Sequence, residues 1–400
     1  ARRGIRERID GGAGDDLLTA AEALHAQARA HVAAGEYAEA LARTGQLRET
    51  LTRAWCAVQS RGARDEFRGF WCHDAFGVAG MTWDAAARIL AENGFTAVFP
   101  NMLWGGAAYY PSDVLPVAPE VKARGDQLAA CVAACRKHGV QCHVWKVNWN
   151  MGARASADFK ARMKAAGRTQ VRLDGAPENG WLCPSHPENQ RLEIDAMLEV
   201  AAKYDADGVH FDYIRYPDRA TCYCPGCKAR FEAVLDRKIA DWPRGLAADP
   251  ALTAQWLEFR RAQITRVVAG VSEALRARKP RVKISAAVFR NAPVDRDTIG
   301  QDWRLWCEKG YLDFVCPMNY TPFDADFERM ARRQRAWAGD TPCYPGIGLS
   351  VWPDSEGVAR LIEQVNITRK LETGGFIVFN YGPREATEIL PLCRLGLTRR

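Results

Sequence analysis

Two kinds of reactive side chain lie close together in the stretch DGVHFDYIRYPDRATCYCPGC, residues 207–227. An apolar run ends in Asp212, whose carboxylate must leave a buried strand there, and His210 shares its face because strand side chains repeat every two residues. Such a carboxylate can act as a nucleophile on an anomeric carbon or as a general acid, with His210, Tyr213 and Arg215 tuning its pKa. Asp212 is therefore the first candidate for a catalytic residue.

The second kind of side chain is the thiol. CYCPGC places Cys222, Cys224 and Cys227 within six residues, and its Pro-Gly turn can direct three sulfurs toward one point, as a tetrahedral zinc site requires. Cys183, in the loop after an earlier expected strand, is our first choice for the fourth ligand. We expect a structural zinc, because four sulfur ligands leave no position for a catalytic water, and free thiols are the alternative. No cofactor is expected to be required for catalysis.

The composition is that of a globular protein with a sizeable core. The 400 residues are 48% hydrophobic and 26% charged, and no apolar run approaches the roughly 20 residues of a membrane helix, so we expect no membrane insertion. The 13 cysteines are an odd number, which excludes a fully paired disulfide framework.

The net charge and the first residue of the chain constrain the partners and the cellular location of the protein only weakly. The net charge of +7 is spread over 55 basic and 48 acidic residues without a nucleic-acid-binding motif, which predicts a solvated surface and no nucleic-acid partner. Residue 1 is not Met, so a targeting segment need not be visible, and we expect an extracytoplasmic protein, periplasmic or secreted. The sequence sets no oligomeric state.

The chain divides into two parts. Residues 1–62 predict an N-terminal helical hairpin that turns at Gly35, with one apolar face running from Leu17 to Val32 and another from Tyr37 to Trp55. One such unit is too small to be stable alone, so we expect it to pack on the main body. Residues 63–400 are expected to form that body.

In the second part, short apolar runs alternate with amphipathic helical stretches. The expected strands lie at residues 67–73, 96–102, 140–149, 208–214, 282–289, 313–320, 343–350 and 375–381. Eight strand and helix repeats, with strands apolar enough to be covered on both faces, predict a parallel (β/α)8 barrel in the α/β class. No glycine-rich phosphate loop follows the first strand, which argues against a dinucleotide-binding fold.

In such barrels the functional side chains gather at the carboxyl ends of the strands. Aromatic and amide residues dominate these ends, and they suit a sugar site because flat rings stack on pyranoses and amides pair with hydroxyls. With His210, Tyr213 and Arg215, the candidate substrate-binding residues are His73, Asn101, Trp104, His143, Trp145, Asn148, Asn319, Tyr320, Asn380 and Tyr381.

The segment DGVHFDYIRYP, with WLCPSHPENQR before it and GYLDFVCPMNYT after it, resembles the glycosyl-hydrolase-like family 10, whose barrels are related to the α-amylase group. The resemblance extends over roughly residues 66–385 and implies a (β/α)8 glycoside hydrolase acting on a polysaccharide or oligosaccharide. It also implies that Asp212, on the fourth strand, is the catalytic carboxylate. In α-amylase barrels an acidic Glu ends the fifth strand, whereas the fifth strand here reads ISAAVFRN and has no carboxylate.

The second catalytic carboxylate must therefore come from elsewhere. Hydrolysis by two carboxylates needs a partner roughly 5–5.5 Å away for retention or roughly 6.5–9.5 Å away for inversion. Asp302, after the fifth strand, and Asp74, after the first, are the candidates. Asp313 opens a strand, at the face of the barrel associated with stability, and is not expected to be catalytic.

Two other functions compete with glycoside hydrolysis. His73, Asp74, His143, His210 and Asp212 could converge on a hydrolytic metal and give a metal-dependent hydrolase or deacetylase, although the paired H-x-H on the first strand of many such barrels is missing. A barrel that binds carbohydrate without cleaving it is the third possibility.

Overall fold

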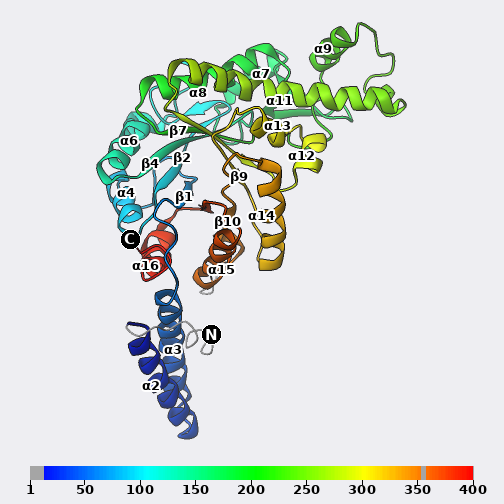
Figure 1. The fold of residues 1–400 in the computed structure, drawn as a ribbon. Coiled ribbons are helices and arrows are strands. Elements are labelled where there is room, and N and C mark those ends of the chain that lie inside the picture. Colours follow the sequence, from blue (N-terminus) through cyan, green and yellow to red (C-terminus); the bar gives the residue numbers. More distant parts are fainter. Residues whose placement is uncertain (1–12, 353–356, 400) are drawn as a thin grey trace.

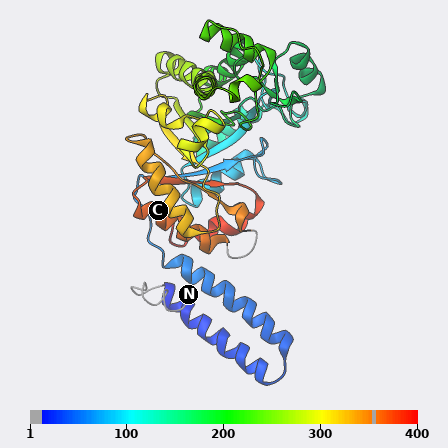
Figure 2. The same ribbon diagram turned by 90° about the vertical axis from the view of Figure 1, so that its right-hand side faces the viewer.

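The computed structural model of the protein describes residues 13–352 and 357–399. Its centre is a barrel of eight parallel strands surrounded by helices, with the hairpin at the amino-terminal end projecting from one side (Figure 1, Figure 2). The predicted (β/α)8 barrel and N-terminal helical hairpin are both confirmed. None of the helices in the described part of the chain is long and apolar enough to cross a membrane.

The barrel strands follow one another around the barrel in the order of the sequence. They are β1 (Phe67–Cys72), β2 (Ala97–Trp104), β4 (Gln141–Val147), β7 (Gly208–Asp212), β8 (Lys283–Val288), β9 (Phe314–Pro317), β10 (Gly346–Gly348) and β11 (Gly375–Phe379). Isolated parallel bridges from Val315 to Cys343 and from Met318 to Gly346 connect the β9 and β10 segments, so that the ring is nearly closed. Most strand residues are buried, as expected for a parallel sheet covered on both faces.

Three short strands lie outside the barrel. They are β3 (Ala107–Ala108), which pairs antiparallel with β2, and the antiparallel pair β5 (Thr169–Val171) and β6 (Pro177–Leu182). The β5–β6 pair lies in the long connection between β4 and β7, after the helix at Ala157–Ala165 and before the helix at Pro187–Lys203.

The helices form the outer layer (Figure 1). Those up to the fifth barrel strand are α4 (Trp83–Glu92), α5 (Glu120–Arg124), α6 (Gln127–His138), α7 (Ala157–Ala165), α8 (Pro187–Lys203), α9 (Pro225–Leu235), α10 (Arg244–Ala247) and α11 (Pro250–Arg278). The later ones are α12 (Ala292–Thr298), α13 (Trp303–Glu308), α14 (Asp324–Ala338), the 3₁₀ turn η1 (Leu349–Val351), α15 (Gly357–Lys370), the π-helical turn η2 (Glu385–Ile389) and α16 (Leu390–Arg394).

The hairpin consists of α2 (Ala13–Ala33) and α3 (Tyr37–Ala57), and Gly35 makes its turn with a φ of 75°. Its helix α3 packs against α15 and α16 of the barrel. Near the turn of the hairpin the expected apolar faces are not buried, since Tyr37 is 67% exposed and Leu41 74% exposed. The predicted domain boundary at residues 62 and 63 falls between α3 and β1 and stays a prediction.

The interior of the barrel is filled largely by aromatic rings. Phe99, Phe314 and the imidazole of His143 pack against one another at centroid distances of 4.9–6.2 Å. Gly208 begins β7 beside this layer, and a Cβ atom there would lie 2.3 Å from Nδ1 of His143. The absence of a side chain at Gly208 therefore makes room for the imidazole.

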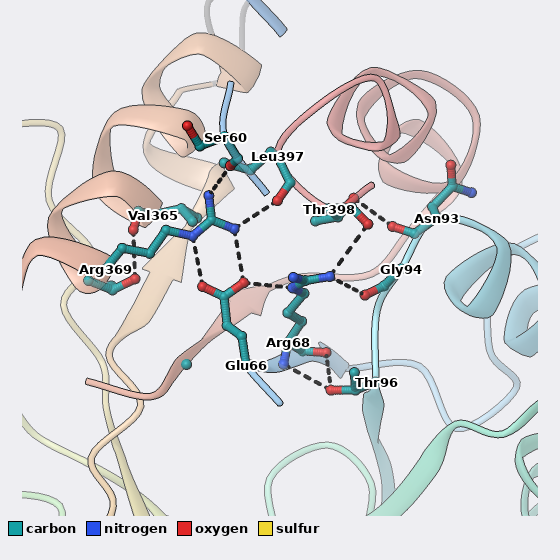
Figure 3. Close-up of polar contacts among 12 residues, drawn as sticks. Ser60, Glu66, Arg68, Asn93, Gly94, Thr96, Val365, Arg369, Leu397 and Thr398 are labelled. Atoms are coloured by element: carbon teal, nitrogen blue, oxygen red, sulfur yellow. Dashed lines mark hydrogen bonds and ion pairs between the residues drawn. The ribbon is translucent and has the colours of Figure 1, made fainter. Parts of the chain in front are cut away.

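At the amino-terminal face, a buried ion network ties the hairpin linker to the barrel (Figure 3). Glu66 accepts hydrogen bonds from Arg68 Nε at 2.7 Å and from Arg369 Nε at 2.8 Å. Arg369 also donates to the carbonyl oxygens of Ser60 and Leu397, at 2.7 Å each. One carboxylate thereby connects the linker, β1, α15 and the carboxyl-terminal segment.

Burial alone would raise the pKa of Glu66, but the hydrogen bonds and charges of Arg369 and Arg68 outweigh it and lower the pKa. The Glu66→Gln variant should be less stable by about 3 kcal/mol at neutral pH, because two largely buried guanidinium groups lose their counter-ion. Urea unfolding at pH 7 measures this change.

The matched control is Glu92→Gln, which removes an exposed ion pair with Arg88 worth only about 0.3–0.5 kcal/mol. The loss in Glu66→Gln should also shrink as the pH falls, since a carboxylate with a lowered pKa stabilises the native state only while it is ionised. Equal losses in the two variants would contradict this account of the network.

Candidate functional site

A cavity of about 180 Å³ opens at the carboxyl ends of the barrel strands. Its lining is mostly aromatic: Trp71, His73, Trp104, Trp145, Val147, Asp212, Tyr213, Ala287, Met318, Tyr320 and Phe379. Asp212 is the one carboxylate among these residues. The side chains come from seven of the eight barrel strands or the residues directly after them, which is the position of active sites in this fold.

A larger hollow of about 560 Å³ lies at the opposite face. It is lined by segments that precede β4, β7 and β8, including Gly139, Asp207 and Lys279. The amino-terminal face of such barrels serves stability rather than catalysis, so we place the functional site at the smaller, aromatic cavity. Asp313 also belongs to this opposite face, where it binds Arg276 at 3.0 Å.

Asp212 ends β7 and is only 5% exposed. Its Oδ2 accepts a hydrogen bond from Trp145 Nε1 at 3.1 Å, and its Oδ1 accepts one from the backbone N–H of Tyr213 at 2.7 Å. Burial raises the pKa of Asp212 to about 6, although these two hydrogen bonds and the charge of Arg215 act in the opposite direction. The carboxyl group can therefore hold a proton under mildly acidic conditions and give it up near neutrality.

The residue after Asp212 has an unusual backbone conformation. Tyr213 has a φ of 53°, in the left-handed region that few non-glycine residues adopt. This conformation directs the Tyr213 N–H at the carboxylate and leaves its ring at the cavity wall. Strained residues of this kind are concentrated at functional sites because the surrounding structure must hold them in place.

Flat rings form the rest of the wall. Tyr320 stacks on Phe379 with centroids 5.5 Å apart and an interplanar angle of 27°. His73 contacts Trp104 and Trp145 edge-on, at 6.0 and 5.7 Å, and burial, helped by the charge of Arg154, lowers its pKa. A neutral imidazole among aromatic faces suits a polar, uncharged ring such as a sugar.

His210 does not reach the cavity but supports its floor. Trp71 Nε1 donates to His210 Nε2 at 2.9 Å, and His210 Nδ1 lies 2.8 Å from the Ser285 hydroxyl. Because an indole N–H can only donate, Nε2 must be unprotonated and Nδ1 must carry the proton. Burial lowers the pKa of His210 well below its usual range, which agrees with this neutral tautomer.

A buried ion pair fixes the ends of β2 and β4. Lys146 Nζ lies 3.1 Å from Glu193 Oε2 and donates to the carbonyl of Trp104, and both charged side chains are fully buried. Asn148 donates to the same Glu193 oxygen at 2.7 Å. Asn148 therefore serves this network and is absent from the cavity lining.

Seven further residues expected to bind substrate also lie away from the cavity lining. Among the amides, Asn319 exchanges two 2.7 Å hydrogen bonds with Gln334, Asn380 accepts from the backbone N–H of His73, and Asn101 is 1% exposed in β2.

The rest of that group is held by the barrel or by nearby loops. His143 is buried in the barrel interior, and the Tyr381 hydroxyl donates to the carbonyl of Ala86. Arg215 stacks over Tyr213 at 4.6 Å and donates to two backbone carbonyls of its own loop. The seventh of these residues is His210. Most of these side chains are therefore held by intramolecular partners, whereas the buried amide of Asn101 has no hydrogen-bond partner among the described residues.

Neither candidate for the second carboxylate lines the cavity. Asp302 precedes α13, where its Oδ2 lies 3.7 Å from Arg296, and Asp74 is exposed and accepts a hydrogen bond from the backbone N–H of Phe76. Asp295 in α12 was not selected from the sequence. It is 7% exposed, burial raises its pKa to about 6, and the charge of Arg215 acts on it as well as on Asp212.

The lining residues that sequence reasoning missed follow from strand alternation. They are Trp71, Val147, Ala287, Met318 and Phe379. Trp71 lies two residues before His73 and Val147 two residues after Trp145, so each shares a face with a residue that was selected. Phe379 is the last residue of β11 and immediately precedes Asn380. Selecting the last residue of this strand, rather than the polar residue after it, would have identified Phe379.

The four cysteines predicted as metal ligands are brought together. The Sγ atoms of Cys183, Cys222, Cys224 and Cys227 all lie within 4.8 Å of one another, and all four side chains are buried. We refer to them as the four-cysteine cluster. A second group, Cys131, Cys135 and Cys142, offers three sulfurs.

Comparison with known proteins identifies the family. The model of the glycosyl hydrolase-like 10 family matches residues 75–346, more than half of the chain. The chain belongs to this family. Glycosyl hydrolase DigH of Escherichia coli strain K12 is 26% identical over 337 residues, which cover 72% of this chain and 73% of the relative. Glycosyl hydrolase YngK of Bacillus subtilis is 24% identical over 328 residues, covering 70% and 58%.

Solved structures agree on the fold. The glycoside hydrolase domain of PgaB (BpsB) from Bordetella bronchiseptica superposes with a TM-score of 0.63 at 14% identity, covering 84% of this chain and 99% of that one. The catalytic domain of a β-amylase from Paenibacillus polymyxa gives a TM-score of 0.55 at 12% identity, covering 82% and 97%. At these identities the similarity shows the barrel fold, and the family membership supports a glycosidase-type function.

The raised pKa of Asp212 has a measurable consequence for stability. The native carboxyl group, with a pKa of about 6, binds its proton more tightly than the unfolded one, with a pKa of about 4. The stability of the parent relative to Asp212→Asn should therefore fall as the pH rises from about 4 to about 6, by up to about 3 kcal/mol. Denaturant unfolding of both proteins across this pH range measures the difference.

The asparagine that replaces Asp212 in the variant does not titrate. Any pH-independent effect of the substitution therefore shifts the stability difference between parent and variant by a constant and does not change how that difference depends on pH. Asp158→Asn, at an exposed position on α7, provides the baseline. A flat difference between the parent and Asp212→Asn would show that Asp212 has an ordinary pKa.

Proposed function

We propose that the protein is a glycoside hydrolase that acts on a polysaccharide or oligosaccharide through Asp212. The observation that carries this proposal is a single buried carboxylate, with a pKa raised to about 6, in an aromatic cavity at the carboxyl end of the barrel. Membership of the glycosyl hydrolase-like 10 family supports the same reaction class.

The geometry favours Asp212 as general acid. Trp145 and the Tyr213 N–H hold the carboxyl group in one orientation, and desolvation keeps it protonated to higher pH than an exposed Asp. In the protonated state it donates a proton to the glycosidic oxygen as the bond to the anomeric carbon breaks. The rings of Trp104, Tyr320 and Phe379 then provide faces on which the sugar can stack.

The partner that activates water or attacks the anomeric carbon is one of three carboxylates near the strand ends. Asp302 and Asp74 were chosen from the sequence, and the structure adds Asp295, whose charge environment is linked to that of Asp212 through Arg215. Single substitutions to Asn at these three positions, assayed with the substrate found below, separate them.

The competing functions have less support. A metal-dependent hydrolase needs converging, free ligands, but in the described residues the ring nitrogens of His210 are bound to Trp71 and Ser285, and the groups with metal-binding geometry contain cysteines alone. A barrel that only binds carbohydrate would show affinity without turnover. Catalysis without a cofactor and an extracytoplasmic location stay predictions.

The test is sugar release by the parent and by Asp212→Asn, assayed against α-glucans, β-galactosides and bacterial surface polysaccharides. Loss of the general acid should lower turnover by about 100- to 10,000-fold while the circular dichroism spectrum is unchanged. Asp158→Asn should retain full activity. Full activity in Asp212→Asn would refute the central role of this carboxylate.

The same assay separates the alternatives. A brief chelator treatment that leaves the melting temperature unchanged should not affect sugar release. If the chelator abolished sugar release, the result would indicate the metal-dependent hydrolase. Glycan binding by calorimetry without release of any sugar would indicate the binding barrel.

A further inference from the structure

The four-cysteine cluster joins two segments that are distant in sequence. Cys183 follows β6 directly, whereas Cys222, Cys224 and Cys227 belong to the connection between β7 and α9 and to the first turn of α9. Three of them are therefore supplied by the segment that begins at Asp212. All four sulfurs are buried, away from the solvent and from the cavity lining.

The spacing of the sulfurs matches a tetrahedral ion site. Zinc–sulfur bonds of about 2.3 Å place the sulfurs of a tetrahedron about 3.8 Å apart. Cys183 Sγ lies 3.8 Å from Cys224 Sγ and 3.4 Å from Cys227 Sγ, and no pair in the cluster exceeds 4.8 Å. Four sulfur ligands complete the coordination of zinc, so the site would be structural.

Hydrogen-bond donors surround the sulfurs, as they do around metal-bound thiolates. The backbone N–H of Val171 donates to Cys222 Sγ at 3.4 Å, and that of Cys227 donates to Cys224 Sγ at 3.3 Å. The Ser185 hydroxyl lies 3.1 Å from Cys227 Sγ.

Positive charge is also close to the cluster. Arg230 Nη2 lies 4.0 Å from Cys183 Sγ, and Arg230 Nε donates to the Ser185 hydroxyl. The fully buried Arg260 donates to the carbonyl oxygen of Thr221, the residue before Cys222, at 2.5 Å. Four thiolates around a divalent cation carry a net charge of −2, which two guanidinium groups can balance.

The cluster is connected to the cavity wall along both segments. Trp181 lies two residues before Cys183, and its ring packs on Tyr213, a cavity residue, at 5.5 Å. Arg215 lies over both rings, at 5.6 Å from Trp181 and 4.6 Å from Tyr213. Tyr223 lies between Cys222 and Cys224, and its backbone N–H donates to the carbonyl of Val171 at 2.8 Å, which joins the two segments.

We propose that the four-cysteine cluster binds one zinc ion, and that this ion holds Trp181 against Tyr213 at the wall of the cavity. The cysteines are positioning residues in this assignment, since they touch neither the cavity nor Asp212. Only the effect on glycan affinity rests on the proposed function. Metal binding and the ordering of the two segments can be measured without any substrate.

The first test is the zinc content of protein purified under reducing conditions, by plasma mass spectrometry. The parent should hold about one zinc per chain, and Cys222→Ser should lose it on dialysis and melt at a lower temperature. Cys222→His, which keeps a zinc ligand, should retain the metal. Cys307→Ser, which removes a buried thiol outside both cysteine groups, should keep the zinc content of the parent.

Removal of zinc from the parent by a thiol-specific mercurial and a metallochromic chelator covers the case in which Cys222→Ser fails to fold. One equivalent of zinc released as four equivalents of the mercurial bind supports the site. A reduced protein without zinc that takes up none on titration overturns it, as does the finding of two disulfides among the four cysteines.

The second test is hydrogen exchange of the segments 169–183 and 213–224, with β1 as the internal control. Loss of zinc should speed exchange at least tenfold in both segments and leave β1 unchanged. If a glycan is cleaved, the zinc-free protein should show a larger rise in KM than fall in kcat, because Asp212 stays on its strand. Unchanged exchange in a protein that has lost zinc would refute the coupling to the cavity wall.

Discussion

Isolated backbone bridges between the β9 and β10 segments bring the two ends of the parallel sheet together into a nearly closed ring, and the position of each cavity residue depends on that arrangement. A closed ring has no exposed edge, and its strands all present their carboxyl ends at one rim. Side chains as far apart in sequence as Trp71 and Phe379 therefore meet around Asp212. The ion network of Glu66 acts at the other end, where it holds the first strand and the carboxyl-terminal segment in the same ring.

The dry interior of this ring determines the chemistry of its polar groups. Water is excluded around Asp212, which raises its pKa, and around His210, which is held as one neutral tautomer between Trp71 and Ser285. The same exclusion requires every buried charge to have a partner, as Glu193 has in Lys146. The aromatic rim and the raised pKa of Asp212 are thus linked, because the rings that line the cavity help to bury the carboxyl group.

Much of the fold was predictable because barrel strands carry a strong local signal. Apolar runs bounded by turns and amphipathic helices gave eight repeats, and the helix turn at Gly35 was found as well. The site was predictable in part. His73, Trp145 and Tyr213 line the cavity as expected, but several amides that follow strands, such as Asn319, are bound by neighbouring side chains. The residue types at the strand ends therefore show which polar and aromatic groups could line the cavity. Packing in the folded protein decides which of these groups are not already bound by neighbouring side chains.

The sequence by itself determined the strand and helix order, the carboxylate that ends the fourth barrel strand, and the C-x-C-x-x-C spacing of Cys222, Cys224 and Cys227, because each is a local pattern of a few residues. Only the tertiary structure decided that Cys183 joins them, that the pKa of Asp212 rises, and that Asp295 is buried near Arg215. Distances between segments and the exclusion of water arise from the closed barrel as a whole, and no short stretch of sequence contains them.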